Sequence, residues 1–110
     1  MAIDELIGPF EVSPDGAGLR IRMVHRIRGT KDGEELRFDY GLSPKNDLYF
    51  ESEPNKEISL TGELNQGETE IVHRTRLVRG AGTAKAFAFI DVTITDSKGT
   101  PFPRTAKLVF

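Results

Sequence analysis

Apolar and polar residues alternate along most of this chain. Residues 19–28, 36–40 and 57–64 each carry apolar side chains at nearly every second position, with charged or hydroxyl-bearing side chains between them. A period of two is typical of β-strands that bury one face and expose the other. No stretch of ten or more residues shows the spacing of an amphipathic helix. The pattern therefore predicts an all-β protein.

Turn-forming residues divide this pattern into short strands. We expect eight strands, over residues 7–12, 18–28, 35–42, 47–52, 56–64, 69–79, 85–96 and 104–110. Short strands at this spacing are typical of an antiparallel sandwich or barrel. The chain has 110 residues, an ordinary size for one domain. We therefore predict one antiparallel β-sandwich over residues 1–110, immunoglobulin-like, with about seven or eight strands.

Three turn signals predict that successive strands pair as hairpins. Asp32-Gly33 is the strongest, because Asp-Gly favours a two-residue turn. That hairpin would set His25 opposite Tyr40 and Arg26 opposite Asp39. A second turn at residues 65–68 would set Glu57 opposite Arg76, and a third is expected at residues 80–84.

A pentapeptide occurs almost twice, as Val24-His25-Arg26-Ile27-Arg28 and Val72-His73-Arg74-Thr75-Arg76. It holds both histidines of the chain, and each histidine has the inward parity of its strand. Two imidazoles from facing sheets can bind a metal or transfer protons. The alternative is that each is a buried histidine satisfied by a backbone carbonyl or by Tyr40.

Asp91 is the one acid in the apolar segment 87–94 of the strand 85–96, and we expect it to pair with Arg74 or Arg76. With the two histidines and a tyrosine it defines a possible small-molecule site between the sheets. The residues of this candidate ligand site are His25, Tyr40, His73 and Asp91.

The strand 85–96 is apolar on both parities, which leaves two orientations open. Phe87 and Phe89 either point into the core or lie on an outer face beside the second arginine strand. In the outer orientation, aromatic, arginine and valine side chains form the composition of an interface core. The residues of this candidate partner-binding surface are Val72, Arg74, Arg76, Val78, Phe87 and Phe89.

The chain lacks the residues that several kinds of catalytic and metal site require. The chain has no cysteine, which excludes disulfides, thiolate zinc sites and cysteine nucleophiles. It has no Gly-x-Ser-x-Gly motif, and its two histidines lack the local spacing of metal ligands. We therefore predict no catalytic residue, no metal site and no cofactor.

The beginning of the chain indicates a cytoplasmic protein without a membrane segment. It has early acids, no signal-like apolar run, and no stretch of about 20 apolar residues. A fragment of an exported protein would look the same.

Charge is distributed unevenly along the chain. The net charge is −2, but residues 32–70 carry a balance of −8 and residues 71–110 a balance of +5. Acidic and basic strands that neutralise each other across a sheet explain this pattern. A dipolar surface used for a partner or for head-to-tail self-association is the alternative. The arginine-rich strands also suggest binding of single-stranded nucleic acid as a further alternative. The acidic pI of about 5.7 argues against this function.

Residues 77–102, with Gly80-Ala81-Gly82 leading into residues 86–95 and then Ser97-Lys98-Gly99, resemble the closing hairpin of hotdog-fold thioesterases. The resemblance covers about a quarter of the chain and implies a hydrolytic domain; it assigns no catalytic residue. Our expectation from the whole sequence is different. We predict a non-enzymatic interaction module that binds a protein partner or self-associates, with small-molecule binding or hydrolysis, and then nucleic-acid binding, as alternatives.

Overall fold

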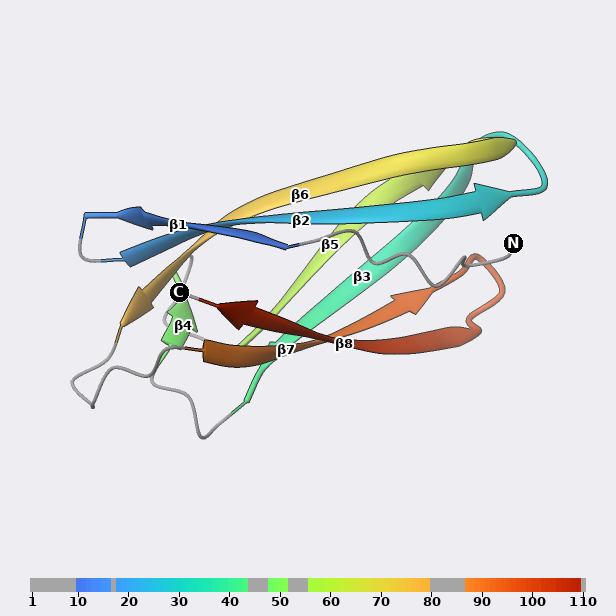
Figure 1. Cartoon of the computed structure of the whole chain (residues 1–110). Helices are drawn as coiled ribbons and strands as arrows, with labels where there is room; N and C mark the ends of the chain where they lie inside the picture. The colour runs from blue at the N-terminus through green and yellow to red at the C-terminus, as the bar shows by residue number, and fades with distance from the viewer. Residues whose placement is uncertain (1–9, 17, 44–47, 52–55, 80–86, 110) are drawn as a thin grey trace.

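The protein is a β-sandwich of two antiparallel four-stranded sheets packed face to face (Figure 1). The computed structural model describes residues 10–16, 18–43, 48–51, 56–79 and 87–109. The predicted all-β sandwich with eight strands is confirmed.

Consecutive strands lie in different sheets, except that the first two strands share one sheet and the last two share the other. One sheet has the order β1-β2-β6-β4 and the other β5-β3-β7-β8. The strands are β1 (Glu11–Asp15), β2 (Gly18–Gly29), β3 (Glu34–Leu42), β4 (Leu48–Phe50), β5 (Glu57–Leu64), β6 (Gly67–Arg79), β7 (Phe87–Thr95) and β8 (Pro101–Val109).

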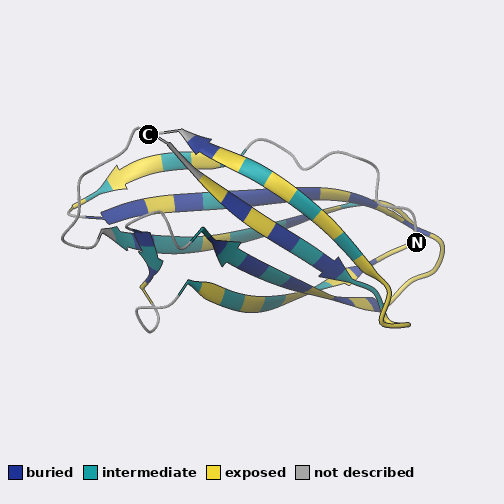
Figure 2. Ribbon diagram, turned by 90° about the horizontal axis from the view of Figure 1, so that it is seen from below, coloured by how far each residue is buried: buried dark blue, intermediate teal, exposed yellow. Residues whose placement is uncertain are grey.

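The core lies between the sheets, where the inward rows of the alternating strands meet (Figure 2). In β2 the inward row includes Ile21, Met23 and Ile27, each at most 1% exposed, while the arginines of the same strand point outward. Phe38, Tyr40 and Phe50 are the largest fully buried side chains. A period of two therefore sorts apolar side chains into the interior, as the sequence predicted.

The predicted strand ranges agree with the observed ones to within a few residues. The largest differences are at the ends of the chain, where β1 spans Glu11–Asp15 instead of residues 7–12 and β8 begins at Pro101 instead of residue 104. β8 is at the edge of its sheet, where a proline without an N–H need not interrupt a ladder of hydrogen bonds. Residues 7–9, 47, 52, 85, 86 and 110 of the predicted strands lie outside the described residues.

The three predicted hairpins are wrong. β2 pairs with β1 and β6, whereas β3 pairs with β5 and β7, so the Asp32-Gly33 turn crosses from one sheet to the other. Gly33 has a positive φ, as the Asp-Gly turn requires. The Asp32 carboxylate accepts the backbone N–H of Gln66 at 2.9 Å, which connects the turn between β2 and β3 to the turn between β5 and β6. Turn chemistry sets a local reversal and does not decide whether the joined strands pair or stack.

The other two expected hairpins fail for the same reason. β5 and β6 lie in different sheets, as do β6 and β7. The third turn itself, at residues 80–84, is outside the described residues. Because β6 and β7 are not paired, residues 77–102 do not form the hairpin on which the hotdog resemblance depended. The sequential hairpins observed are β1–β2 and β7–β8.

A membrane-spanning helix is not found in the part of the chain that the structure describes.

Candidate functional site

A chain of hydrogen bonds crosses the core between the two sheets. It joins His25 of β2, Tyr40 of β3 and His73 of β6. The Tyr40 hydroxyl oxygen lies 2.7 Å from Nε2 of His25 and 2.6 Å from Nδ1 of His73. The other nitrogen of His73, Nε2, lies 2.9 Å from the backbone oxygen of Thr61 in β5. Three strands of the two sheets and the edge strand β5 are thus linked through polar atoms.

The backbone carbonyl of Thr61 determines which group donates and which accepts in each of these hydrogen bonds. The Thr61 oxygen can only accept, so Nε2 of His73 donates, and in neutral imidazole Nδ1 must then accept. Tyr40 therefore donates its hydroxyl hydrogen to His73, and its oxygen accepts from Nε2 of His25. This leaves Nδ1 of His25 as an acceptor, and it has no hydrogen-bond partner among the described residues.

Burial strongly shifts the pKa values of His25 and Tyr40. His25 and Tyr40 are each 1% exposed and lie among aromatic rings. Burial, and then the charge of His73, lower the pKa of His25 to about 4. Burial also raises the pKa of Tyr40 far above its ordinary value. Both groups are therefore neutral near pH 7.

The structure brings together three of the four residues of the candidate ligand site. His25, Tyr40 and His73 meet, but both histidines belong to the same sheet, so the expectation of imidazoles from facing sheets is wrong. Asp91 is exposed on the outer side of β7 and accepts the hydroxyl of Thr105 at 2.8 Å, so its predicted pairing with Arg74 or Arg76 is also wrong. Apart from Nδ1 of His25, the polar atoms of the three are engaged within the fold. No group of three His, Cys, Asp or Glu side chains in the described residues is placed to hold a metal.

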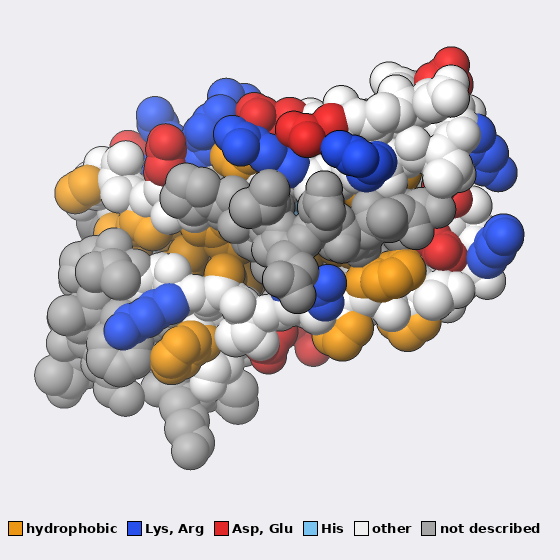
Figure 3. Space-filling view, turned by 45° about the vertical axis from the view of Figure 1, so that its right-hand side comes forward, with side chains coloured by type: hydrophobic (Ala, Val, Ile, Leu, Met, Phe, Trp, Pro, Cys, Tyr) orange, Lys and Arg blue, Asp and Glu red, His pale blue; other side chains and the backbone are white. Residues whose placement is uncertain are grey.

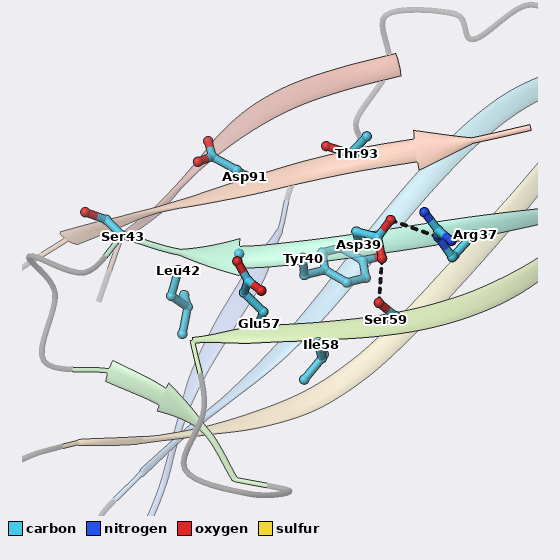
Figure 4. A pocket seen from close by; sticks show the side chains of 11 residues that line it. Arg37, Asp39, Tyr40, Leu42, Ser43, Glu57, Ile58, Ser59, Asp91 and Thr93 are labelled. Atoms are coloured by element: carbon cyan, nitrogen blue, oxygen red, sulfur yellow. Dashed lines mark hydrogen bonds and ion pairs between the residues drawn. The ribbon is translucent and has the colours of Figure 1, made fainter. Parts of the chain in front are cut away.

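Asp91 instead lines a groove on the outer side of the sheet β5-β3-β7-β8. Figure 4 shows this groove, which has a volume of about 600 Å³ and is bordered by three neighbouring strands. Its lining residues are Arg37, Asp39, Tyr40, Gly41, Leu42, Ser43, Glu57, Ile58, Ser59, Asp91 and Thr93.

Gly41 is at the middle of this groove. It faces Glu57 of β5 on one side and Asp91 of β7 on the other. A Cβ atom built on Gly41 would meet nothing within 4 Å. The missing side chain therefore leaves a hollow between the two carboxylates. An outward glycine within an alternating strand was the sequence signal for this site, and our sequence analysis missed it.

A third carboxylate is held in place along β3. Asp39 accepts the Nε–H of Arg37 at 3.0 Å and the hydroxyl of Ser59 at 2.5 Å (Figure 4). Asp91 is held by Thr105, as described above. Asp39 and Asp91 thus have partners from their own sheet that fix their orientation, while their contact with solvent leaves further lone pairs for a ligand.

The candidate partner-binding surface is divided between the two sheets. Four of its residues lie on the outer side of β6: Val72, Arg74, Arg76 and Val78. We call the outer side of this sheet, formed by β1, β2, β6 and β4, the arginine face. Phe89 is 46% exposed, but it lies on β7, on the outer side of the other sheet, which we call the groove face. Phe89 therefore does not point into the core. The strand position of Phe87 is also in β7, and its side chain lies outside the described residues.

Carboxylates surround most of the arginines on the arginine face, and both signs are mixed along the top of Figure 3. Arg26 pairs with Glu70 at 3.6 Å instead of the expected Asp39. Arg76 pairs with Asp15 at 3.1 Å and Glu51 at 3.0 Å instead of the expected Glu57. The expected partners were wrong because they followed from the wrong hairpins.

Comparison with known proteins bears on the fold alone. No family model and no curated protein matches the chain. Among solved structures, the chain is similar to part of the catalytically inactive OgpA from Akkermansia muciniphila, crystallised with an O-glycopeptide substrate. The TM-score is 0.50 at 11% identity, over 100% of this chain and 29% of that protein. The chain thus spans less than a third of the length of the protein that it resembles.

Proposed function

We propose that this domain is a non-enzymatic interaction module that binds a cationic segment of a polypeptide on its groove face. The observation that carries the proposal is the groove over Gly41, where Asp39, Glu57 and Asp91 border a hollow in an otherwise regular sheet. A guanidinium or ammonium group matches such a site, because it donates several hydrogen bonds and carries the opposite charge.

The chemistry of the rest of the molecule supports binding more than catalysis. The side chains of His25 and His73 both hydrogen-bond to the Tyr40 hydroxyl in the core, and of these three residues only Tyr40 also lines the groove. The groove itself offers carboxylates and the hydroxyls of Ser59 and Thr93, which recognise a ligand through hydrogen bonds.

The order of the strands supports an immunoglobulin-like sandwich. Without β5, the chain order of the sheets is that of strands A-B-E-D and C-F-G in an immunoglobulin domain. β5 then extends the second sheet beside β3. Because one fold hosts many unrelated functions, the interaction role is argued from the groove and not from this architecture.

Titration of the labelled protein with model peptides tests the proposal. We expect a hexa-arginine peptide to shift the backbone amide resonances of Gly41, Asp91 and Ser59, and a hexa-glutamate peptide to leave them unchanged. Gly41→Gln fills the hollow without a backbone clash and should abolish the shifts. Thr61→Gln is the matched control, because it adds the same side chain on β5 outside the groove. Shifts that survive Gly41→Gln would contradict the proposal.

A further inference from the structure

The two outer faces of the sandwich differ in charge. On the groove face, the described outward positions carry five carboxylates, on Glu35, Asp39, Glu57, Glu63 and Asp91, against the two cations of Arg37 and Lys107. The arginine face carries five carboxylates and six outward arginines, so its balance is +1 compared with −3 on the groove face; the arginines are Arg20, Arg22, Arg26, Arg28, Arg74 and Arg76. One molecule therefore presents complementary charges on opposite sides.

The carboxylates of the arginine face lie around its border. Glu11 and Asp15 are on the edge strand β1, Glu51 follows β4, and Glu68 and Glu70 are at one end of β6. The centre is occupied by Arg22 and Arg74, which face each other across β2 and β6. Like charges directly opposite each other destabilise a sheet.

The two central arginines are not neutralised equally within the molecule. Arg22 has a distant carboxylate partner in Glu11, at 3.5 Å. Arg74 is exposed and has no ion pair in the part of the chain that the structure describes. The centre of this face thus carries cationic charge that a carboxylate from outside would neutralise.

Resting on the proposed function, we propose that the cationic partner of the groove is a second copy of this chain, docked with its arginine face on the groove face. Arg74 of one copy would enter the hollow over Gly41 and meet Asp91 and Glu57 of the next. The contact would also set Val72, beside Arg74, near the exposed Phe89 of the next copy, so that the divided surface predicted from the sequence is completed between two molecules.

This contact is head to tail, because the two faces that meet are different. Such a contact does not close on itself in a dimer and leaves one unused face at each end, so that assembly continues with concentration. The molecule measures 45 × 22 × 20 Å, and its broad face is only slightly larger than the roughly 800 Å² per partner of a standard interface. Because the contact is formed by opposite charges, we expect the association to depend on the salt concentration.

Sedimentation equilibrium of the full chain tests the proposal. At about 1 mM protein and roughly 0.01 M salt, where screening extends over about 30 Å, we expect an average mass well above the 12.2 kDa monomer. At about 1 M salt, where the screening length is about 3 Å, we expect the monomer. A monomer under both conditions overturns the proposal.

Charge exchange tests the residues in contact. Arg74→Glu and Asp91→Lys should each weaken association about tenfold or more, because each sets like charges against each other. An equimolar mixture of the two variants should associate again, because the carboxylate introduced on β6 of one variant then meets the ammonium group introduced on β7 of the other. Lys98→Glu changes the net charge as Arg74→Glu does but lies in the β7–β8 turn, away from both faces, and should associate like the wild type. Association that Arg74→Glu does not weaken, or that the mixture fails to restore, overturns the proposal.

This result can be separated from the proposed function. A wild-type protein that remains monomeric but binds hexa-arginine in the groove retains the function and overturns the second copy as partner. If the protein assembles but hexa-arginine does not shift the amide resonances of the groove, assembly uses other surfaces. That outcome overturns both the proposed function and the second copy as partner.

Discussion

The hydroxyl of Tyr40 lies between two imidazoles in the centre of the protein. It accepts a hydrogen bond from His25 and donates one to His73, so both rings depend on one oxygen atom. Because His25 is buried, its Nε2 cannot turn to water if that oxygen is removed, whereas His73 is partly exposed. The hydrogen bonds through Tyr40 therefore have a structural role, because they link β2, β3 and β6.

We predict that Tyr40→Phe destabilises the protein by about 2–4 kcal/mol, since it leaves two polar nitrogens without a partner at roughly 1–3 kcal/mol each. The measurement is the free energy of unfolding in urea. Tyr49→Phe is the control, because Tyr49 is only half-buried and its ring contact with Lys56 does not need the hydroxyl. Equal losses in the two variants would rule out the special role of the Tyr40 hydroxyl.

The buried His25 makes stability depend on pH. Its pKa of about 4 in the folded protein lies below its unfolded value of roughly 6.5, so the unfolded chain binds the proton first as pH falls. The free energy of unfolding should be unaffected by this group above pH 6.5, and should decrease by about 3 kcal/mol between pH 6.5 and 4.

His25→Phe should remove this part of the pH dependence, while carboxylates that titrate in the same range affect both proteins. The measurement is the difference between wild type and variant in urea unfolding, at intervals from pH 7 to 4. A difference that does not change with pH would show that His25 is not responsible.

At the scale of the strands, Arg76 connects parts of the chain that are far apart in sequence. Its guanidinium donates to the carboxylate and the backbone oxygen of Asp15, at 3.1 and 2.9 Å, and to the carboxylate of Glu51 at 3.0 Å. It thereby holds the end of β1 and the end of β4 against β6. Gly18 permits this arrangement, since a Cβ there would lie 2.4 Å from the backbone oxygen of Leu77 and 3.1 Å from the guanidinium carbon.

We predict that Arg76→Met destabilises the protein by about 1–2 kcal/mol, because half-buried hydrogen bonds to charged groups contribute more than exposed pairs. Arg74→Met, on the same face two residues earlier, should change stability by less than about 0.5 kcal/mol. Thermal and urea unfolding of the two variants measure the difference. A loss in Arg74→Met as large as in Arg76→Met would contradict the assignment.

At the scale of the whole molecule, most strands pair with strands that are distant in sequence. β2 pairs with β6 and β3 with β7, while the chain passes repeatedly between the layers. Closing long loops costs entropy before the contacts stabilise the fold. The topology therefore governs the folding rate of this small domain.

We expect refolding in milliseconds to seconds, as in other sandwiches dominated by non-local pairing. Stopped-flow dilution from urea measures this rate, with intrinsic tyrosine fluorescence as the signal. Refolding in microseconds would mean that local hairpins, and not the pairing of distant strands, limit the rate.

The sequence by itself determined the approximate strands and the face of most of their residues, but it left the faces of Phe87 and Phe89 open. The alternation of apolar and polar side chains is a local property, and burial of one face of each strand follows from it, as the inward row of β2 illustrates. The same parity placed His25, Tyr40 and His73 in the interior. It also placed Arg74 and Arg76 outward.

Only the tertiary structure decided which strands are neighbours. A short turn can join two strands of one sheet or cross between two sheets, because both arrangements reverse the chain and bury the same faces. His25 does contact Tyr40, as expected, but across the core and not along a hairpin. The groove around Gly41 and the separation of Phe89 from Arg74 followed from this choice of partners, since both depend on strands distant in sequence.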